Sequence, residues 1–260
     1  MKIDVHCHLT AAEFSGDLDA VMQRAADMVV VSSGVDLQDN QKVLDLTKRF
    51  SNMKASFGVY PVDAVSLSEK KLQESFDFIR KHRKEMLYLG EAGLDYKELE
   101  DKKKQQDIFQ QVIQLAEKLK KPLLIHSRKA EEDCIRMVET SSLRKVIFHC
   151  FTGEMKLVRK IADDGWGFSI PASIVRSKHF QQLVQEVNIA QLLTETDAPY
   201  LSPFSFVKEK ALGEKENISY GRNEPAFVAE GLRKIAELKL LDVGETENLL
   251  YQNFQKMFLV

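Results

Sequence analysis

Short apolar runs alternate with longer amphipathic segments along the whole chain. The short runs are rich in β-branched residues, which is typical of strands, and the longer segments place apolar residues at helical spacing. Strands are therefore expected at residues 3–8, 28–33, 54–60, 87–91, 122–126, 145–149, 166–170 and 192–195. Helices are expected at residues 17–27, 36–49, 68–84, 101–121, 129–139, 154–164, 178–186, 224–238 and 245–258.

Eight strands that alternate with helices predict an α/β fold of the (β/α)8 TIM-barrel type. A doubly wound open sheet is the alternative, and it would place a glycine-rich phosphate turn after the first strand. That position holds His6-Cys7-His8-Leu9-Thr10 instead, so the nucleotide-binding fingerprint is absent. Because α/β barrels of roughly 250 residues commonly form one domain, a single domain is expected over residues 1–260.

Composition and charge narrow the class of protein. The chain is 44% apolar and 29% charged, which excludes disordered, collagen-like and coiled-coil proteins. It has 37 Lys and Arg against 39 Asp and Glu, a formal net charge of −2. No overall positive field would hold duplex DNA, so any contact with nucleic acid is expected to be local.

The cysteines and the first residues bear on the cellular compartment. Cys7, Cys134 and Cys150 are odd in number and form no CxxC pattern, which indicates reduced thiols. The opening MKIDVHCHL contains no signal-peptide run, and no stretch of 18 apolar residues occurs. A globular cytoplasmic protein without membrane contact is therefore expected.

Two histidines lie at the end of the first expected strand. His6 and His8 are two residues apart, so both side chains lie on one face of the strand, while Cys7 lies on the other. Asp4 shares the face of the histidines one step deeper, where it could accept a hydrogen bond or orient a ligand. Taken alone, the pair is compatible equally with a metal site and with polar packing at a barrel mouth.

Four more metal-capable residues lie at or just after expected strands, namely Glu91, His126, His149 and Asp197. In a (β/α)8 barrel these carboxyl ends converge on the catalytic face. Six such residues together favour one shared site over six separate polar residues, and four histidines with two carboxylates suffice for two ions.

The donor types indicate the metal and the chemistry. Histidine nitrogens favour Zn²⁺, Mn²⁺ or Ni²⁺ without excluding Mg²⁺. Two ions about 3.5–4 Å apart suit cleavage of a phosphoester by an activated water. Glu91 is the candidate bridge between them, and Asp197 could both bind the first ion and accept the proton of the water.

Residues further along the loops are candidates for binding substrate or closing the barrel. Arg128 follows His126 by two residues and could grip a phosphate, with a salt bridge at the rim as the equal alternative. Arg222 and Asn223 could close the eighth βα unit or touch substrate, and the structural role, with Asn223 as a helix N-cap, is favoured. The stretch 202–222 is expected to be a surface loop that could act as a lid.

Six motifs together resemble those of a known family, the TatD-type metal-dependent hydrolases. They are DVHCH at 4–8, GEAGLDY at 90–96, LIHSR at 124–128, FHCFTG at 148–153, TETDAPYL at 194–201 and RNEP at 222–225. The resemblance implies a TIM barrel with divalent metals and a nuclease activity, often a 3′-to-5′ exonuclease or deoxyribonuclease. It assigns one metal to His6, His8 and Asp197, the other to His126 and His149, and places Glu91 between them.

One position departs from the family pattern. Members commonly have G-x-H-P after the third strand, and here Tyr60 replaces the histidine in Gly58-Val59-Tyr60-Pro61. A phenol can donate a hydrogen bond to a phosphate but cannot shuttle protons near neutral pH, so the substrate or the rate could differ. Tyr60 is therefore a candidate substrate contact. Barrels of the lactonase and phosphotriesterase type use a carboxylated lysine where Glu91 stands, which favours the TatD-like branch.

Three functions are open at this point. The first is a deoxyribonuclease of the 3′–5′ exonuclease type that acts on DNA ends, with two divalent ions drawn from Mg²⁺, Mn²⁺ and Zn²⁺. The second is hydrolysis of an aminoacyl ester, lactone or amide at the same site. The third is a metal-binding or nucleic-acid-binding protein without turnover. The near-neutral charge predicts that DNA is bound weakly and in a salt-sensitive way.

Overall fold

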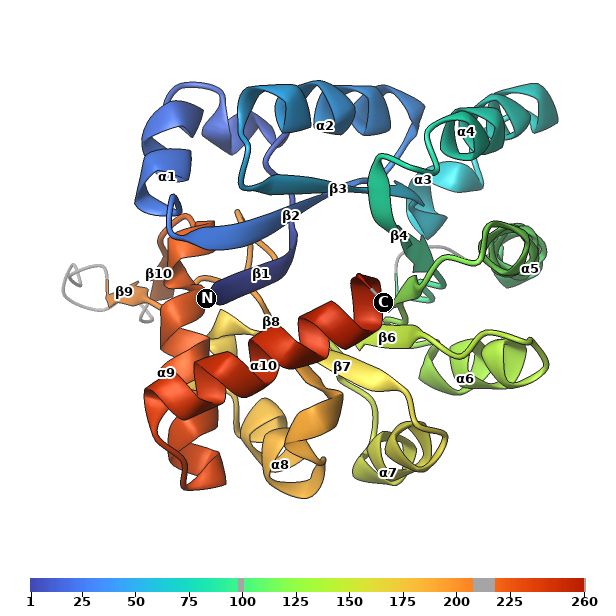
Figure 1. The fold of residues 1–260 in the computed structure, drawn as a ribbon. Helices are drawn as coiled ribbons and strands as arrows, with labels where there is room; N and C mark the ends of the chain where they lie inside the picture. Colours follow the sequence, from blue (N-terminus) through green and yellow to red (C-terminus); the bar gives the residue numbers. More distant parts are fainter. Residues whose placement is uncertain (98–100, 208–217, 260) are drawn as a thin grey trace, which may run out of the picture.

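Eight parallel strands form the centre of the structure, which is a computed structural model that describes residues 1–97, 101–207 and 218–259. The strands follow one another around the sheet in chain order, and β1 lies next to β8 in a nearly closed barrel (Figure 1). They are β1 (Lys2–Cys7), β2 (Met28–Gly34), β3 (Met53–Val59), β4 (Met86–Gly93), β5 (Leu123–His126), β6 (Val146–His149), β7 (Gly167–Pro171) and β8 (Leu192–Glu195). The predicted TIM-barrel fold is confirmed.

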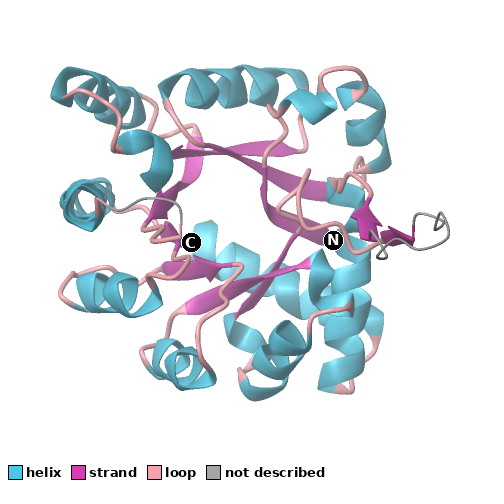
Figure 2. Cartoon of the chain, turned by 180° about the vertical axis from the view of Figure 1, so that it is seen from behind, coloured by secondary structure: helices cyan, strands magenta, loops and turns pink. Residues whose placement is uncertain are grey.

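Helices surround the barrel, as the view from behind shows (Figure 2). They are α1 (Leu18–Arg24), α2 (Leu37–Arg49), α3 (Pro61–Ala64), α4 (Glu69–Lys81), α5 (Lys102–Leu119), α6 (Glu131–Glu139), α7 (Met155–Asp163), α8 (Lys178–Glu186), α9 (Val228–Lys239) and α10 (Val243–Phe258). Several begin where a side chain accepts a hydrogen bond from the first turn, as Asp36, Ser68 and Asp101 do. None of the helices in the described part of the chain is long and apolar enough to cross a membrane.

The barrel interior is apolar at its amino-terminal end. Buried residues of several strands, such as Val5, Leu124 and Ile147, form a cluster there that is separate from the larger core beneath the outer helices. Helix α10 crosses this end of the barrel and adds Phe254 to the cluster, while Phe258 lies against Tyr88, with ring centroids 5.2 Å apart (Figure 1). Helix α10 therefore forms the floor of the barrel, and the opposite end stays available for a site.

A buried carboxylate joins the first strand to the last. Asp4 is fully buried, and its Oδ1 accepts hydrogen bonds from the backbone N–H of Thr196 (2.9 Å) and of His6 (3.2 Å). Its Oδ2 accepts a further bond from the Thr196 hydroxyl. The side chain thus accepts backbone N–H hydrogen bonds, which backbone carbonyls accept elsewhere in the sheet. Of the two roles expected for Asp4, accepting hydrogen bonds is the one observed.

The observed elements differ from the expected ones mainly at their ends. Helix α10 begins two residues earlier than expected, because Asp242 caps it by accepting from the N–H groups of Gly244 and Glu245. Helix α9 begins at Val228, because a 3-10 turn (Pro225–Phe227) precedes it. The expected loop 202–222 contains a short antiparallel pair, β9 (Ser205–Val207) and β10 (Ile218–Tyr220). Residues 208–217, on which most of the lid prediction rests, lie outside the described residues.

The prediction that Asn223 caps a helix is wrong, because the turn and the helix that follow begin after Glu224 and Phe227. Its amide Nδ2 donates to the carbonyls of Thr196 (2.8 Å) and Tyr200 (2.7 Å), while its Oδ1 accepts from the N–H of the next residue, Glu224. Arg222 donates to the Asp17 carboxylate at 2.6 and 2.7 Å. Both residues therefore hold the segment after β8 against the rest of the barrel, which is the structural role expected for them.

Candidate metal centre

The six side chains predicted from strand ends meet at the carboxyl end of the barrel. They line or lie beneath a cavity of about 640 Å³. The six are His6 on β1, His8 just after it, Glu91 on β4, His126 at the end of β5, His149 at the end of β6, and Asp197 two residues past β8. Residues up to 191 positions apart in the sequence thus come together because parallel strands end at one face.

Glu91 lies at the centre of the group, buried to 3% exposure. Its Oε1 lies 2.7 Å from His126 Nδ1 and 2.9 Å from His149 Nε2. Its Oε2 lies 3.6 Å from the Nε2 atoms of both His6 and His8. One carboxylate therefore faces two histidine pairs with its two oxygens, which is the arrangement required of a bridge between two ions.

Asp197 completes the group around the first histidine pair. Its Oδ1 lies 3.6 Å from His6 Nε2 and 3.4 Å from His8 Nε2, too far for hydrogen bonds. Donors that share a tetrahedral ion with bonds of about 2.1 Å lie about 3.4 Å apart, so the spacing suits a shared cation. The buried His6 Nε2 has no hydrogen-bond partner among the described residues, so a cation would satisfy it. The residues therefore fit a divalent metal.

Groups behind the histidines orient their rings. The Nδ1 atom of His6 lies 2.8 Å from the hydroxyl of Ser33, which in turn contacts the hydroxyls of Ser56 (2.7 Å) and Tyr88 (3.0 Å). The Tyr88 hydroxyl donates to the carbonyl of Val5 at 2.7 Å. A polar network thus separates the apolar floor from the candidate site, and it leaves His6 Nε2 directed at the carboxylates.

Two acidic residues behind the other histidines were not predicted as site residues. His126 Nε2 lies 2.9 Å from Asp95 Oδ2, and His149 Nδ1 lies 3.6 Å from Glu195 Oε1. Both carboxylates are fully buried. Spacing offers a signal for Glu195, which shares the strand face of Asp197 two residues later. Asp95 lies two residues past the end of β4 and at even spacing from Glu91, so the same signal applies to it.

A glycine allows β4 and β5 to approach closely beside the site. Gly93 has a φ of +151°, and a Cβ built there would lie 1.9 Å from the carbonyl oxygen of His126. Only glycine fits such a position. The close approach brings Glu91 within hydrogen-bond distance of His126.

The electrostatics of the group follow from burial and from opposite neighbours. Burial raises the pKa of Glu91, but the nearby imidazoles of His149 and His126 lower it more, so that it lies well below its usual range. Burial lowers the pKa of His126, but the carboxylates of Asp95 and Glu91 raise it more, so that it lies above its usual value. His126 therefore holds a proton more readily than in water, whereas burial lowers the pKa of His6, and a cation that binds at His126 must displace its proton.

Removal of the Asp95 charge is expected to weaken metal binding. In Asp95→Asn the partner of His126 Nε2 loses its charge, so we expect divalent-metal affinity to fall about 10- to 100-fold. Titration against a chelating dye measures this. Asp107→Asn is the matched control, because Asp107 is exposed on α5 and forms an ion pair with Lys103. Equal affinities for the Asp95 variant and the control would contradict a metal at His126.

The two predicted substrate contacts both line the cavity. Arg128 is an exposed residue on the loop after β5. Tyr60 lies with its ring edge to the ring of His126, with centroids 5.1 Å apart. Tyr200, which sequence reasoning did not single out, lines the same cavity with 54% of its surface exposed. The mouth therefore combines a cation with two aromatic rings beside the candidate metal centre.

The family model and the relatives that match this chain indicate the same family. The family model described as TatD related DNase matches residues 3–259. The chain is 31% identical to an uncharacterized metal-dependent hydrolase, MJ1582, of Methanocaldococcus jannaschii, over 98% of this chain and 96% of that protein. It is 31% identical to deoxyribonuclease TATDN3 of Homo sapiens, over 98% of this chain and 94% of that protein.

A nuclease and a solved structure extend the comparison. The chain is 28% identical to the 3′-5′ ssDNA/RNA exonuclease TatD of Salmonella typhimurium, over 90% of this chain and 89% of that protein. The crystal structure of YJJV, a TatD homolog from Escherichia coli, superposes with a TM-score of 0.85 at 23% identity, covering 100% of this chain and 98% of that one. At that identity the structural likeness concerns the fold.

Proposed function

The chain belongs to the TatD-related DNase family of metal-dependent hydrolases, and we propose that it is a deoxyribonuclease that removes nucleotides from DNA ends in the 3′-to-5′ direction. The observation that carries the proposal is the position of Glu91, whose two oxygens face two separate histidine pairs. Such a bridge suits two ions that act together on one phosphate.

The proposed cofactors are two divalent ions, drawn from Mg²⁺, Mn²⁺ and Zn²⁺. His6, His8 and Asp197 would hold one, His126 and His149 the other, and Glu91 both. When bound, such ions neutralise charge on a phosphate and lower the pKa of a water molecule. The four imidazoles favour a transition metal over Mg²⁺, which prefers oxygen ligands.

The residues around the centre would bind and orient the substrate. Asp197 keeps a pKa below its usual range, because His8 and the other imidazoles outweigh the effect of burial, so its carboxylate is ready to accept a proton. Arg128 would contact a phosphate oxygen from the cavity wall, and Tyr60 would donate a hydrogen bond or stack on a base. A cavity of about 640 Å³ suits a strand end rather than a duplex.

Release of nucleotides from end-labelled single-stranded DNA tests the proposal. The reaction is run with Mg²⁺, Mn²⁺, Zn²⁺ or EDTA, with the label at either end. We expect stepwise shortening from the 3′ end that requires metal. An absence of cleavage with every metal, despite metal bound to the protein, would reject the nuclease proposal.

The cavity also supports a second candidate, hydrolysis of an aminoacyl ester. Asp39 and Asp63 line the wall that follows β2 and β3, where they would suit the ammonium group of such a substrate. Tyr60 lies on the same wall, at the position where the family commonly has histidine. Release of an amino acid from aminoacyl-tRNA, in a reaction that leaves DNA uncut, would favour this candidate.

Removal of the Arg128 guanidinium is expected to weaken binding of the substrate. In Arg128→Ala the KM for DNA should rise about 10- to 100-fold, the value of a charged hydrogen bond of about 1.5–3 kcal/mol. Steady-state kinetics measures the change. The control is Arg136→Ala, since Arg136 pairs with Asp133 on the surface of α6. A KM equal to that of the control would indicate that Arg128 forms a structural salt bridge and does not bind substrate.

A further inference from the structure

Basic residues gather at the amino-terminal end of the barrel, opposite the candidate metal centre. The segments that enter β4, β5 and β6 are neighbours in the sheet, and each carries two of these residues. Lys256 on α10 lies at the same end. The set is called the basic rim here and consists of Arg83, Lys84, Lys120, Lys121, Arg144, Lys145 and Lys256.

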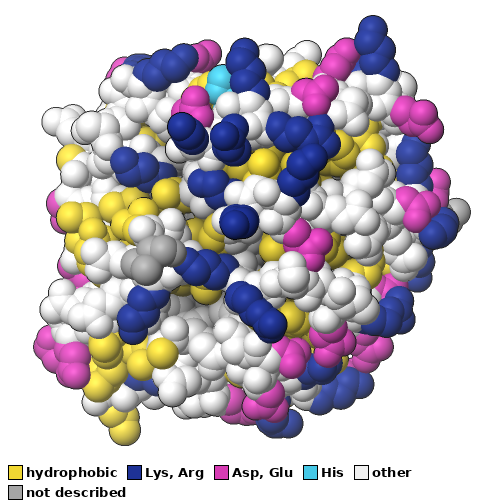
Figure 3. Space-filling view, turned by 45° about the vertical axis from the view of Figure 1, so that its right-hand side comes forward, with side chains coloured by type: hydrophobic (Ala, Val, Ile, Leu, Met, Phe, Trp, Pro, Cys, Tyr) yellow, Lys and Arg dark blue, Asp and Glu magenta, His cyan; other side chains and the backbone are white. Residues whose placement is uncertain are grey.

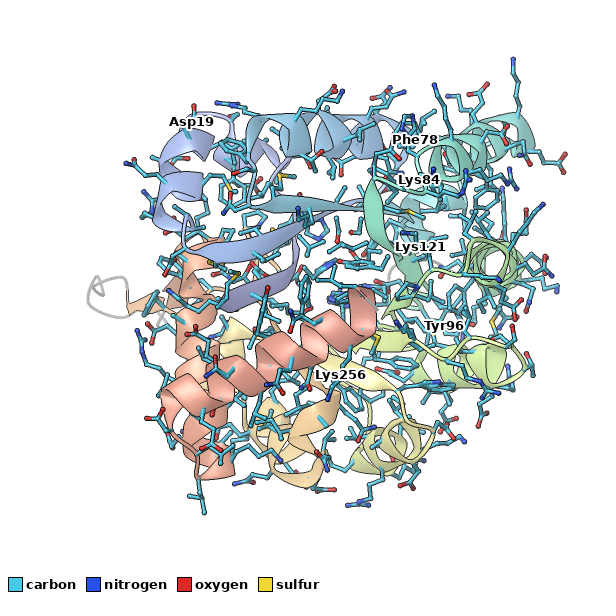
Figure 4. The ribbon with its side chains drawn as sticks, viewed as in Figure 1. Asp19, Phe78, Lys84, Tyr96, Lys121 and Lys256 are labelled. Atoms are coloured by element: carbon cyan, nitrogen blue, oxygen red, sulfur yellow. The ribbon has the colours of Figure 1, made fainter. Side chains whose placement is uncertain are left out.

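Backbone and side-chain contacts hold the segments of the basic rim together. Lys121 Nζ donates to the carbonyl of Met86 at the start of β4 (2.6 Å). The N–H of Leu123 donates to the carbonyl of Lys145 (3.0 Å). Figure 4 labels Lys84, Lys121 and Lys256 along the side of the barrel where α10 ends.

Most of the charges in the basic rim are not neutralised by the protein. Among the residues that the structure describes, Arg83, Lys84, Lys120, Arg144 and Lys256 are exposed and have no ion pair. Cations on the helices around the barrel often pair with an acidic neighbour instead, as Arg136 does with Asp133. Figure 3 shows the Lys and Arg side chains gathered on this side with few carboxylates between them.

Two of the other entry segments carry the opposite charge, while Lys48 and Arg49, which precede β3, are both paired with aspartates. Asp27 precedes β2, and Asp163 and Asp164 precede β7. Within residues 82–85, 120–122 and 140–145, which lead into β4, β5 and β6, Glu85 is the single carboxylate. The positive charge is therefore concentrated on one arc of a protein whose net charge is −2, which makes it a local field for a polyanion.

The cavity itself offers little attraction to a long nucleic acid. Among the described residues that line it, Arg128 is the one Lys or Arg, and Asp39 and Asp63 line it too. Neutralisation of successive phosphates supplies most of the sequence-independent affinity of nucleic-acid-binding proteins. We propose that the basic rim is a second nucleic-acid contact, which binds the phosphates of a strand far from the end held at the metal centre. This proposal rests on the proposed function in one respect, that the substrate is a nucleic acid, and it does not require that the protein cleaves it.

The length of the barrel sets the minimum length of strand that would reach both places. The eight residues of β4 span about 26 Å at about 3.3 Å per residue. A stacked single strand covers that length in about eight nucleotides at about 3.4 Å each. A tetranucleotide would therefore reach the cavity alone, whereas an oligonucleotide of about 30 nucleotides would reach the basic rim as well.

Binding in EDTA tests the proposal apart from catalysis. The probe is fluorescence anisotropy of labelled single-stranded DNA, and the variant replaces the five unpaired cations by glutamine. Affinity for the long oligonucleotide should fall at least about tenfold at low salt, and the slope of log K against log salt should drop by up to about 3.5, or about 0.7 per phosphate contact. Tetranucleotide binding and turnover should not change. The substitutions are Arg83→Gln, Lys84→Gln, Lys120→Gln, Arg144→Gln and Lys256→Gln.

A control with the same change in net charge separates a specific surface from a general effect of charge. It replaces by glutamine five cations within α2, α6, α7 and α9, namely Lys42, Arg136, Arg159, Arg233 and Lys234. Equal losses in both variants would overturn the proposal. So would a loss that the rim variant shows only with anionic phospholipid vesicles, because the surface would then serve a membrane. Failure of the nuclease assay with rim-dependent binding intact would reject the proposed reaction alone.

Discussion

Replacement of Glu91 by alanine should abolish turnover of DNA while the barrel stays folded. The side chain contacts all four histidines of the candidate metal centre within 3.6 Å. Among the described residues Glu91 is the carboxylate that faces both histidine pairs, so its loss would leave the two proposed ions without a shared ligand. We expect the rate to fall by more than about 100-fold, the upper range for loss of a group that only supports a metal ligand.

Three measurements separate this result from general damage. Rates come from the end-labelled DNA assay, bound metal from elemental analysis, and folding from the circular dichroism of the variant. Glu139→Ala is the matched control, because Glu139 is a surface residue that pairs with Lys160. A Glu91→Ala enzyme with the activity and metal content of that control would show that Glu91 does not bridge ions.

Replacement of Asp4 by alanine should destabilise the barrel. Asp4 accepts three hydrogen bonds in a fully buried position, from the N–H of His6 and from the N–H and hydroxyl of Thr196. Alanine leaves these donors without an acceptor, and each loss costs about 1–3 kcal/mol. We therefore expect the free energy of unfolding to fall by at least about 3 kcal/mol, measured by urea denaturation.

Asparagine at the same position provides the comparison. In Asp4→Asn the amide oxygen can still accept from both backbone N–H groups, so a loss of only about 1 kcal/mol is expected. If both variants were as stable as the parent protein, the contact between Asp4 and Thr196 would not contribute to closing the barrel. If both variants kept their stability but lost metal, Asp4 would support metal binding and not the closure of the barrel between β1 and β8.

The sequence predicted the strands well, because a short run of apolar, β-branched residues is a local signal. His6, His126 and His149 each lie in the strand that was expected for them. Their convergence follows from one rule, that parallel strands of a barrel end at one face. The same rule brought Glu91 and Asp197 into the candidate site, although their roles as metal ligands stay predictions.

The supporting residues were harder to predict, because their contacts depend on side-chain packing between distant segments. Ser33 lies in the expected second strand, but its contact with His6 depends on the register of β1 against β2. Asp95 reaches His126 from the loop after β4, across 31 positions of the sequence. The pairing of Asp4 with Thr196 joins residues 192 positions apart. A single sequence contains no local signal for any of these contacts.

The floor of the barrel has a consequence for how the protein is made. Helix α10 follows all eight strands in the chain, yet Phe254 and Phe258 cover the apolar interior that those strands surround. During vectorial synthesis the strands leave the ribosome before the helix that closes them, so their inner apolar face stays open to water until residues 243–258 emerge. The nascent protein is thus expected to need chaperones most just before this helix emerges.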